Sequence, residues 1–276
     1  MQILHAGSPS EVAAMDTQAL RRQFLLDKIF EPDQVRLTYS HYDRMIVGGA
    51  MPVEQILRLD APAGLRAEFF LERRELGILN IGGSGKVSTE SGTFTLEKLD
   101  CLYLGKGTTE VHFQSDEADK PALFYFLSAP AHRSCPARRM TAAEANPNQL
   151  GNQSTANART IFKYIHPDGI ESCQLVMGLT VLEPGSVWNT MPPHTHDRRM
   201  EVYCYFDIPD GQRVLHLMGE PQQTRHLWMG NLQGAISPPW SIHAGCGTMS
   251  YSFIWGMAGE NQSFADMDQI AVGALL

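Results

Sequence analysis

Short apolar runs separated by glycine-rich turns constrain the fold of this chain more than any other feature of its sequence. Residues 77–81 and 101–104 are two such runs with an alternating pattern, and glycines occur at 82–85 and at 91–92. Alternation is typical of strands, and glycine between them of hairpin turns. Earlier, residues 10–30 carry four apolar side chains at helical spacing: Leu20, Phe24, Leu25 and Ile29. We therefore expect a mainly β fold with a few short helices.

The composition suits two lobes of this kind. The chain has 276 residues, 43% of them hydrophobic, with 24 glycines and 16 prolines, which fits short strands joined by turns around one large core or two smaller ones. Residues 141–157 are polar, as in an exposed connector. We therefore place an N-terminal lobe, including the helical segment, at residues 1–145 and a C-terminal lobe at residues 146–276.

Charge and targeting signals exclude several classes of partner. The formal net charge of −8 argues against nucleic acid or an acidic membrane, because binding phosphates calls for a basic surface. The start of the chain lacks a basic segment followed by a long apolar run, and no stretch approaches a membrane span. The five cysteines are scattered without CxxC spacing, as expected of reduced thiols. These features predict a cytoplasmic protein.

The motif that carries chemistry is an H-x-H-x4-E cluster followed by a distant histidine: His194, His196, Glu201 and His243. Side chains two apart on a strand point the same way, so His194 and His196 can share an ion. Glu201 has the opposite parity and needs a turn, which we expect to be a tight hairpin at residues 197–199. On the returning strand, Tyr203 then faces the metal. The N-terminal lobe has only scattered histidines, so we expect no metal cluster there.

Three imidazoles and a carboxylate suit zinc, iron, manganese, nickel or cobalt and leave room for water or substrate. The sequence does not choose among these ions. The alternative is that the four residues are unrelated core or surface side chains.

The cluster resembles the metal motif of cupins, small antiparallel barrels that carry His-x-His, then Glu, then a later His. A more specific resemblance, to the 5-keto-4-deoxyuronate isomerase family, runs along nearly the whole chain. Eight segments carry it: residues 39–44 (YSHYDR), 70–77 (FLERRELG), 128–132 (SAPAH), 163–167 (KYIHP), 184–191 (PGSVWNTM), 194–202 (HTHDRRMEV), 216–221 (HLMGEP) and 254–261 (IWGMAGEN).

The resemblance implies a two-lobed, bicupin-like antiparallel β-barrel or jelly roll with one zinc ion per subunit, assembled as a hexamer. It implies a ketol-isomerase of pectin and uronate degradation that converts 5-dehydro-4-deoxy-D-glucuronate to 3-deoxy-D-glycero-2,5-hexodiulosonate. In that reaction the metal holds O1 and O2 while a base moves a proton from C2 to C1.

Several residues are candidates for the remaining roles, and each also has a structural interpretation. The candidate bases are Glu201, Tyr203, Lys163 and His226. Arg199 and Arg225 could bind the substrate carboxylate through paired hydrogen bonds, or could form surface ion pairs instead.

Two rival functions remain open at this level. An iron-dependent cupin dioxygenase would use the same ligands with oxygen at the open positions. A non-catalytic sugar-binding cupin would use the metal for structure alone.

Overall fold

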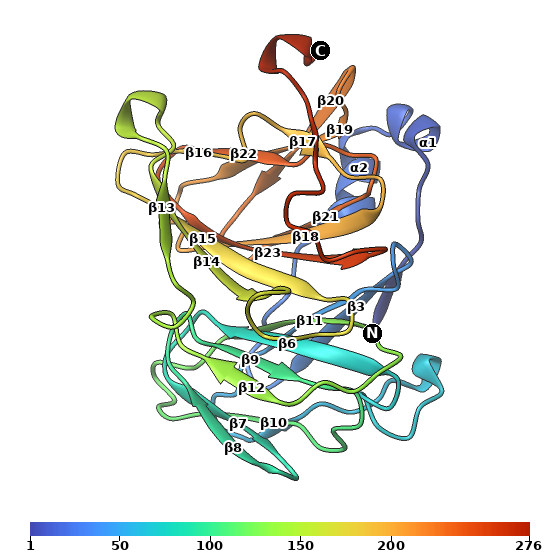
Figure 1. The fold of residues 1–276 in the computed structure, drawn as a ribbon, viewed down its shortest axis with the longest axis vertical. Helices are drawn as coiled ribbons and strands as arrows, with labels where there is room; N and C mark the ends of the chain where they lie inside the picture. The colour runs from blue at the N-terminus through green and yellow to red at the C-terminus, as the bar shows by residue number, and fades with distance from the viewer. The chain divides into compact units, whose positions relative to one another are not determined.

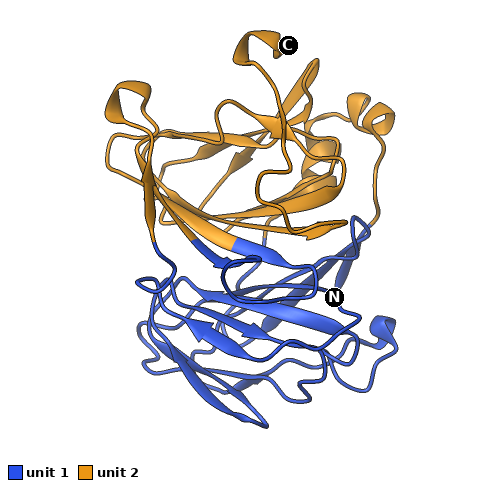
Figure 2. Cartoon of the chain, in the orientation of Figure 1, with its two compact units in different colours: residues 1–4, 28–146, 163–177 blue, residues 5–27, 147–162, 178–276 orange.

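The computed structural model describes all 276 residues and confirms a mainly β protein, whose elements are labelled in Figure 1. The chain forms two compact units, coloured in Figure 2. Unit 1 comprises residues 1–4, 28–146 and 163–177, and unit 2 comprises residues 5–27, 147–162 and 178–276. No helix is long and apolar enough to cross a membrane.

Unit 1 contains two sheets. The larger has seven strands, in the order β1 (Gln2–Leu4), β3 (Val35–Ser40), β4 (Ile46–Ala50), β11 (Phe124–Pro130), β6 (Arg74–Asn80), β9 (Cys101–Leu104) and β12 (Arg138–Met140). The smaller has four, in the order β5 (Leu57–Arg58), β10 (His112–Ser115), β7 (Gly85–Thr89) and β8 (Gly92–Leu96). The strand pairs are antiparallel except β1 with β3. A 3-10 turn, η1, spans Ala63–Leu65.

The two sheets of unit 1 pack through aromatic side chains. Phe113 of the smaller sheet lies 5.3 Å from Phe124 and 5.8 Å from Phe126 of the larger one, measured between ring centres. All three rings are fully buried in one apolar cluster with residues of both sheets. Burying aromatic rings of this size is the main stabilising contribution to such a sandwich.

Unit 2 repeats the arrangement. Its larger sheet has the order β13 (Asn148–Leu150), β14 (Arg159–Ile165), β15 (Val176–Leu182), β23 (Ser252–Gly259), β18 (Arg199–Phe206), β21 (Gly234–Ser237) and β2 (Leu25–Leu26). Residues 163–165 of β14 and 176–177 of β15 are grouped with unit 1. Its smaller sheet has the order β16 (Trp188–Asn189), β22 (Ala244–Gly247), β19 (Val214–Glu220) and β20 (Gln223–Met229). Two short strands, β17 (His194–Thr195) and β24 (Asp268–Gln269), pair with each other. Two 3-10 turns, η2 (Gln153–Thr155) and η3 (Val272–Ala274), complete the unit.

The helical segment expected near the N-terminus forms two short helices, α1 (Pro9–Ala13) and α2 (Thr17–Phe24). Asp16 caps α2 by accepting a hydrogen bond from the backbone of Ala19 at 2.7 Å. The helix ends where Leu25 turns extended and enters β2. Ile29, which the helical spacing included, therefore lies beyond the helix.

Of the two glycine-containing turns that were expected to form hairpins, one does and the other does not. The turn at 91–92 joins β7 to β8, which pair as a hairpin. The glycine-rich segment at 82–85 was expected to be a hairpin as well, and this was wrong: it joins β6 to β7, which belong to different sheets. Glycine marks a close backbone approach there, because a Cβ on Gly82 would lie 2.6 Å from the carbonyl oxygen of Pro121.

The compact units differ from the single boundary expected after residue 145. Residues 5–27 belong to unit 2, because β2 pairs with β21 and Arg225 donates hydrogen bonds to the carbonyls of Val12, Ala13 and Met15. Residues 163–177 belong to unit 1, where Glu75 accepts hydrogen bonds from three backbone N–H groups of residues 173–175. Contacts between residues far apart in sequence decide both assignments.

Candidate metal centre and its pocket

The four predicted ligands converge in unit 2 from three places in the fold. His194 lies on β17, His196 in the turn that follows, Glu201 on β18, and His243 directly before β22. Their ligand atoms all lie within 4.8 Å of one another, and the structure contains no other group of three or more potential ligands. The predicted cluster is thus present in the fold.

The predicted hairpin between His196 and Glu201 was wrong. The backbone N–H of Arg199 donates to the carbonyl of His196 at 2.9 Å, which closes a tight turn. The strands on either side of this turn do not pair: β17 pairs with β24, and β18 lies between β21 and β23. The turn nevertheless brings the side chain of Glu201 to the same side as the two histidines. An uninterrupted strand would have pointed it to the opposite face.

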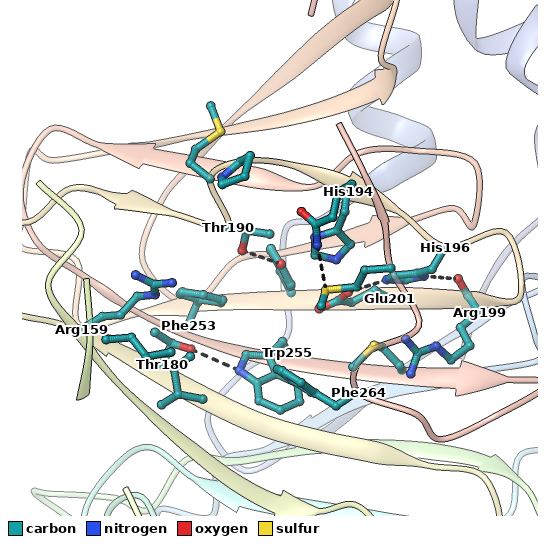
Figure 3. A pocket seen from close by; sticks show the side chains of 18 residues that line it. Arg159, Thr180, Thr190, His194, His196, Arg199, Glu201, Phe253, Trp255 and Phe264 are labelled. Atoms are coloured by element: carbon teal, nitrogen blue, oxygen red, sulfur yellow. Dashed lines mark hydrogen bonds and ion pairs between the residues drawn. The ribbon is translucent and has the colours of Figure 1, made fainter. Parts of the chain in front are cut away.

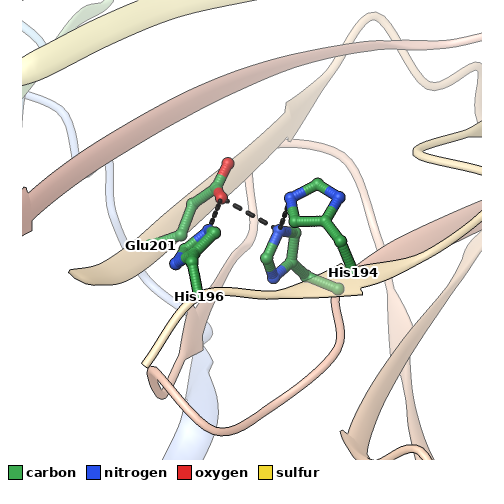
Figure 4. Close-up of side chains that lie close together, drawn as sticks. His194, His196 and Glu201 are labelled. Atoms are coloured by element: carbon green, nitrogen blue, oxygen red, sulfur yellow. Dashed lines mark hydrogen bonds and ion pairs between the residues drawn. The ribbon is translucent and has the colours of Figure 1, made fainter. Parts of the chain in front are cut away.

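The side chains of the cluster point toward one another, and dashed lines mark the contacts between them (Figure 4). Glu201 Oε2 lies 3.1 Å from His196 Nε2 and 3.0 Å from His243 Nε2. His243 Nε2 in turn lies 2.9 Å from His194 Nε2. Ligands about 2.0–2.2 Å from a common metal are separated by about 3 Å or slightly more, so the arrangement fits a single transition metal.

The outer ring nitrogens are held by neighbouring groups. His196 Nδ1 lies 2.8 Å from the carbonyl oxygen of Arg199, an acceptor, so Nδ1 carries the proton. In the neutral ring, Nε2 then presents a lone pair to the Glu201 carboxylate. His243 Nδ1 lies 3.2 Å from Ser237 Oγ. Such outer contacts fix the tautomer and orientation of metal-binding imidazoles, and a cation between the inner atoms would remove the repulsion between lone pairs.

Burial and the contacts within the cluster together set the charges of its members. Burial alone would lower the pKa of His196, but the hydrogen bond and charge of Glu201 outweigh it and raise this pKa. Burial and the nearby His243 lower the pKa of His194 to about 3, so its imidazole is neutral at pH 7. Burial alone would raise the pKa of Glu201, but the charges and hydrogen bonds of His243 and His196 outweigh it and lower this pKa, which keeps the carboxylate ionised. Neutral imidazoles and an ionised carboxylate are the forms that bind metals.

The cluster forms one wall of a pocket of about 290 Å³. Figure 3 shows its lining side chains. Tyr203 and Thr190 contribute hydroxyl groups 3.1 Å apart. The opposite walls are mainly apolar, with Trp255, Phe253 and Phe264 among the side chains. A candidate metal cluster in the wall of a pocket that combines apolar side chains with convergent polar groups is typical of an active site.

Arg199 is the most unusual side chain of the pocket. It is 0% exposed, yet its Nε and Nη1 atoms make no hydrogen bond. Only Nη2 is satisfied, by the carbonyl of Asp266 at 2.8 Å, and the Asp266 carboxylate is 4.0 Å from Nε. Burial lowers the pKa of Arg199, but the guanidinium stays charged at neutral pH. A buried cation with two unused donors is costly unless an anionic ligand completes it.

Several other predicted site residues lie elsewhere. His226 is exposed on β20, because Leu227 and Met229 take the inward positions of that strand. Arg225 binds the carbonyls at the end of α1. Lys163 falls in unit 1 and does not line the pocket. Of the candidate bases, the structure therefore brings only Glu201 and Tyr203 to the cluster.

The structure also adds residues that the sequence analysis missed. Arg159 on β14 lines the pocket as a second cation. His216 on β19 is fully buried, with Nδ1 2.8 Å from the hydroxyl of Tyr205 and Nε2 without a partner. Arg159 and Ile161 are two residues apart on one strand, so their side chains point to the same face, and both line the pocket. The position of His216 depends on the pairing of β19 with β20 and β22.

Comparisons with known proteins show the family of this chain. The model of the KduI/IolB family matches residues 25–273. The chain is 53% identical over 277 residues to the 4-deoxy-L-threo-5-hexosulose-uronate ketol-isomerase of Yersinia enterocolitica, and 50% identical over 275 residues to that of Shouchella clausii, with 100% of each chain covered in both cases.

Solved structures support the fold. An IolB-like protein from Salmonella typhimurium matches with a TM-score of 0.74 at 14% identity, covering 90% of this chain and 96% of that one. The oxalate decarboxylase of Bacillus subtilis matches with a TM-score of 0.55 at 11% identity, covering 81% and 71%. The two-sheet units are therefore cupin-like, as the resemblance implied.

Proposed function

Because the chain belongs to the KduI/IolB family, we propose that it is a metal-dependent ketol-isomerase of 5-dehydro-4-deoxy-D-glucuronate. The observation that carries this proposal is the meeting, in one pocket, of a metal-binding cluster and an incompletely paired arginine. The first suits the hydroxy-aldehyde end of such a substrate, and the second suits its carboxylate. Relatives about half identical over their full length bear the name of this activity.

Arg199 would bind the substrate carboxylate. Its Nε and Nη1 groups have no hydrogen-bond partner, and each of these two donors, on different edges of the guanidinium, could donate to an oxygen of an anionic group. Arg159, half-buried in the same pocket, adds positive charge. The buried setting strengthens this attraction, because little water is present to screen it.

Glu201 would move the proton between C2 and C1. It is the only carboxylate that lines the pocket, and both of its contacts with the histidines use Oε2. Its Oε1 has no hydrogen-bond partner and is not among the enclosed unpaired atoms, so it remains accessible for a proton. The carbon-bound proton of C2 passes to Oε1 and returns at C1, while the O2 proton moves to O1. Atoms and electrons balance without an oxidant.

Tyr203 and Thr190 would orient the sugar. Burial raises the pKa of Tyr203 far above its usual value, so its hydroxyl stays protonated and donates hydrogen bonds rather than acting as a base. The Thr190 hydroxyl beside it can both donate and accept. Together they offer neutral partners for substrate hydroxyl groups.

Zinc is the ion we propose for the cluster, held by His194, His196, Glu201 and His243. Bound there, it would supply Lewis acidity that stabilises negative charge on the substrate oxygens. Imidazoles and one carboxylate are common zinc ligands. Metal analysis of the purified protein tests this assignment.

The experiment is to incubate the metal-loaded protein with 5-dehydro-4-deoxy-D-glucuronate in deuterated water and to follow C1 and C2 by NMR. We expect the C2 ketone to form with deuterium at C1 and with no uptake of oxygen. The variant Arg199→Met should lose this conversion, and Arg213→Met serves as its matched control, since Arg213 is exposed and is not among the pocket-lining residues. Unchanged substrate would refute the isomerase, and oxygen consumption would favour the dioxygenase alternative.

A further inference from the structure

A second pocket lies within unit 1, away from every metal-binding residue. Its volume is about 540 Å³, and its walls carry three arginines, Arg44, Arg73 and Arg74, but no aspartate or glutamate. In a protein of formal net charge −8, three cations without a carboxylate on one concave surface indicate a site for an anion.

Arg74 is the buried member of this group. It is 7% exposed and donates from Nε to Ser128 Oγ at 3.0 Å and from Nη2 to the carbonyls of Ser128 and Arg44, each at 2.6 Å. Its guanidinium lies over the ring of Tyr39, 6.0 Å from the ring centre. Burial lowers the pKa of Arg74 to about 10, so it remains a cation at pH 7. The hydroxyl and carbonyl groups that accept hydrogen bonds from Arg74 are neutral, and its Nη1 group makes no hydrogen bond.

Of the two carboxylates that flank these arginines in sequence, Glu75 is engaged elsewhere and Glu72 offsets part of the charge of Arg73. Glu75, next in sequence, points to the other face of β6, where it accepts hydrogen bonds from Tyr103 and from three backbone N–H groups. Glu72 lies 3.7 Å from Arg73, which itself donates to the carbonyls of Leu65 and Arg66. The positive charge of Arg74 is therefore offset only weakly within the protein.

Arg44 completes the site from the rim. Its side chain is exposed and has no hydrogen bond or ion pair of its own. The turn that presents it is unusual, because Asp43 and Arg44 both have positive φ, at 45° and 54°. Non-glycine residues pay about 1 kcal/mol or more for such a conformation, and here the carbonyl of Arg44 is held by Arg74. The two arginines are thus coupled in position, one inside the pocket and one at its edge.

We propose that this pocket binds a second carboxylated sugar of hexuronate size. Planar guanidinium groups match a carboxylate, and the remaining walls, with Tyr39, Phe70 and Leu65, suit the faces of a sugar ring. A pocket of about 540 Å³ is far larger than a lone inorganic anion requires. The choice of a uronate rests on the proposed isomerase function, whereas the binding of an anion follows from the pocket alone.

The test uses the full-length chain with Arg199→Met, so that carboxylate binding at the metal pocket is disabled. Isothermal titration with D-galacturonate should then show one site per chain. Adding Arg44→Gln should weaken it about tenfold or more, because a charge-assisted contact is lost. Arg58→Gln is the matched control: Arg58 is exposed on β5 and pairs with Asp60 outside the pocket. D-galactose, which lacks the carboxylate, should not bind.

Three kinds of result would count against this site or its proposed ligand. No binding of galacturonate, or equal loss with Arg44→Gln and Arg58→Gln, would refute the site. Inorganic phosphate binding more tightly than galacturonate would refute the uronate. If Arg44→Gln lowers the melting temperature, phenylglyoxal labelling of the unmutated protein decides: galacturonate should protect Arg44 but not Arg58. Failure of the isomerase would appear separately, as absent turnover in the wild-type protein.

Discussion

Replacing Arg199 with methionine separates a substrate-binding role from a structural one. Methionine has a similar length and fills the space without a charge. The protein would lose one hydrogen bond, from Nη2 to the Asp266 carbonyl, and a weak 4.0 Å pairing. It would also be relieved of a buried cation with two unused donors. Replacing poorly paired buried charges with apolar groups is often neutral or stabilising, so we expect the free energy of unfolding to change by about 1 kcal/mol or less.

The effect on catalysis should be much larger. Nε and Nη1 have no hydrogen-bond partner within the protein, and each hydrogen bond that such a charged group makes to the substrate would contribute about 1.5–3 kcal/mol. Their combined loss, about 3–6 kcal/mol, corresponds to a fall in kcat/KM of roughly 100-fold to 10,000-fold, because 1.4 kcal/mol is about tenfold.

Steady-state kinetics and thermal unfolding of the same preparation measure both quantities. Arg213→Met is the matched control: Arg213 is exposed in the same unit, its side chain donates only to the carbonyl of Gln212 and it does not line the pocket, so its loss should leave kcat/KM within a few-fold of wild type. An Arg199→Met protein that keeps its kcat/KM, or that loses activity only because its melting temperature collapses, would refute the reasoning.

Three further predictions concern the same unit. Glu201→Gln removes the only anionic ligand, so zinc retained after dialysis should fall at least tenfold by elemental analysis; full retention would contradict the ligand assignment. Gly178→Ala should destabilise the protein by about 1–3 kcal/mol in denaturant unfolding, since its Cβ would overlap the Trp255 ring and lie 2.5 Å from the Phe162 carbonyl oxygen; an unchanged midpoint would disprove this packing. Burial lowers the pKa of His216 to about 3, so the unfolded state binds a proton more readily, and wild type should lose up to about 1.4 kcal/mol per pH unit below pH 6.5. His216→Asn should show a shallower slope, and equal slopes would exclude this contribution.

The sequence predicted that His194, His196 and Glu201 lie together because the spacing of these three residues is local. The two-residue spacing of His194 and His196 puts both rings on one side, and the parity of Glu201 requires a turn between them. The turn is present at residues 196–199. The local sequence did not predict how the strands on either side of this turn pair. β17 pairs with β24, more than sixty residues away in sequence, so the expected hairpin does not form.

The arginines show the limit of local reasoning most clearly. Arg199 and Arg225 were equivalent candidates in the sequence, but Arg199 lines the pocket and Arg225 binds the end of α1. Arg159 was missed altogether, and the arginines of unit 1 form a pocket only because β3, the turn after it and β6 meet.

By itself, then, the sequence determined the β class, the four ligands and the alternation that points Tyr203 toward them, because strand periodicity is a property of neighbouring residues. The tertiary structure alone decided which cations are buried without a carboxylate, which of the candidate bases reach the cluster, and to which unit residues 5–27 and 163–177 belong. Burial and pairing depend on segments that are distant along the chain, and only the closed sheets bring these together.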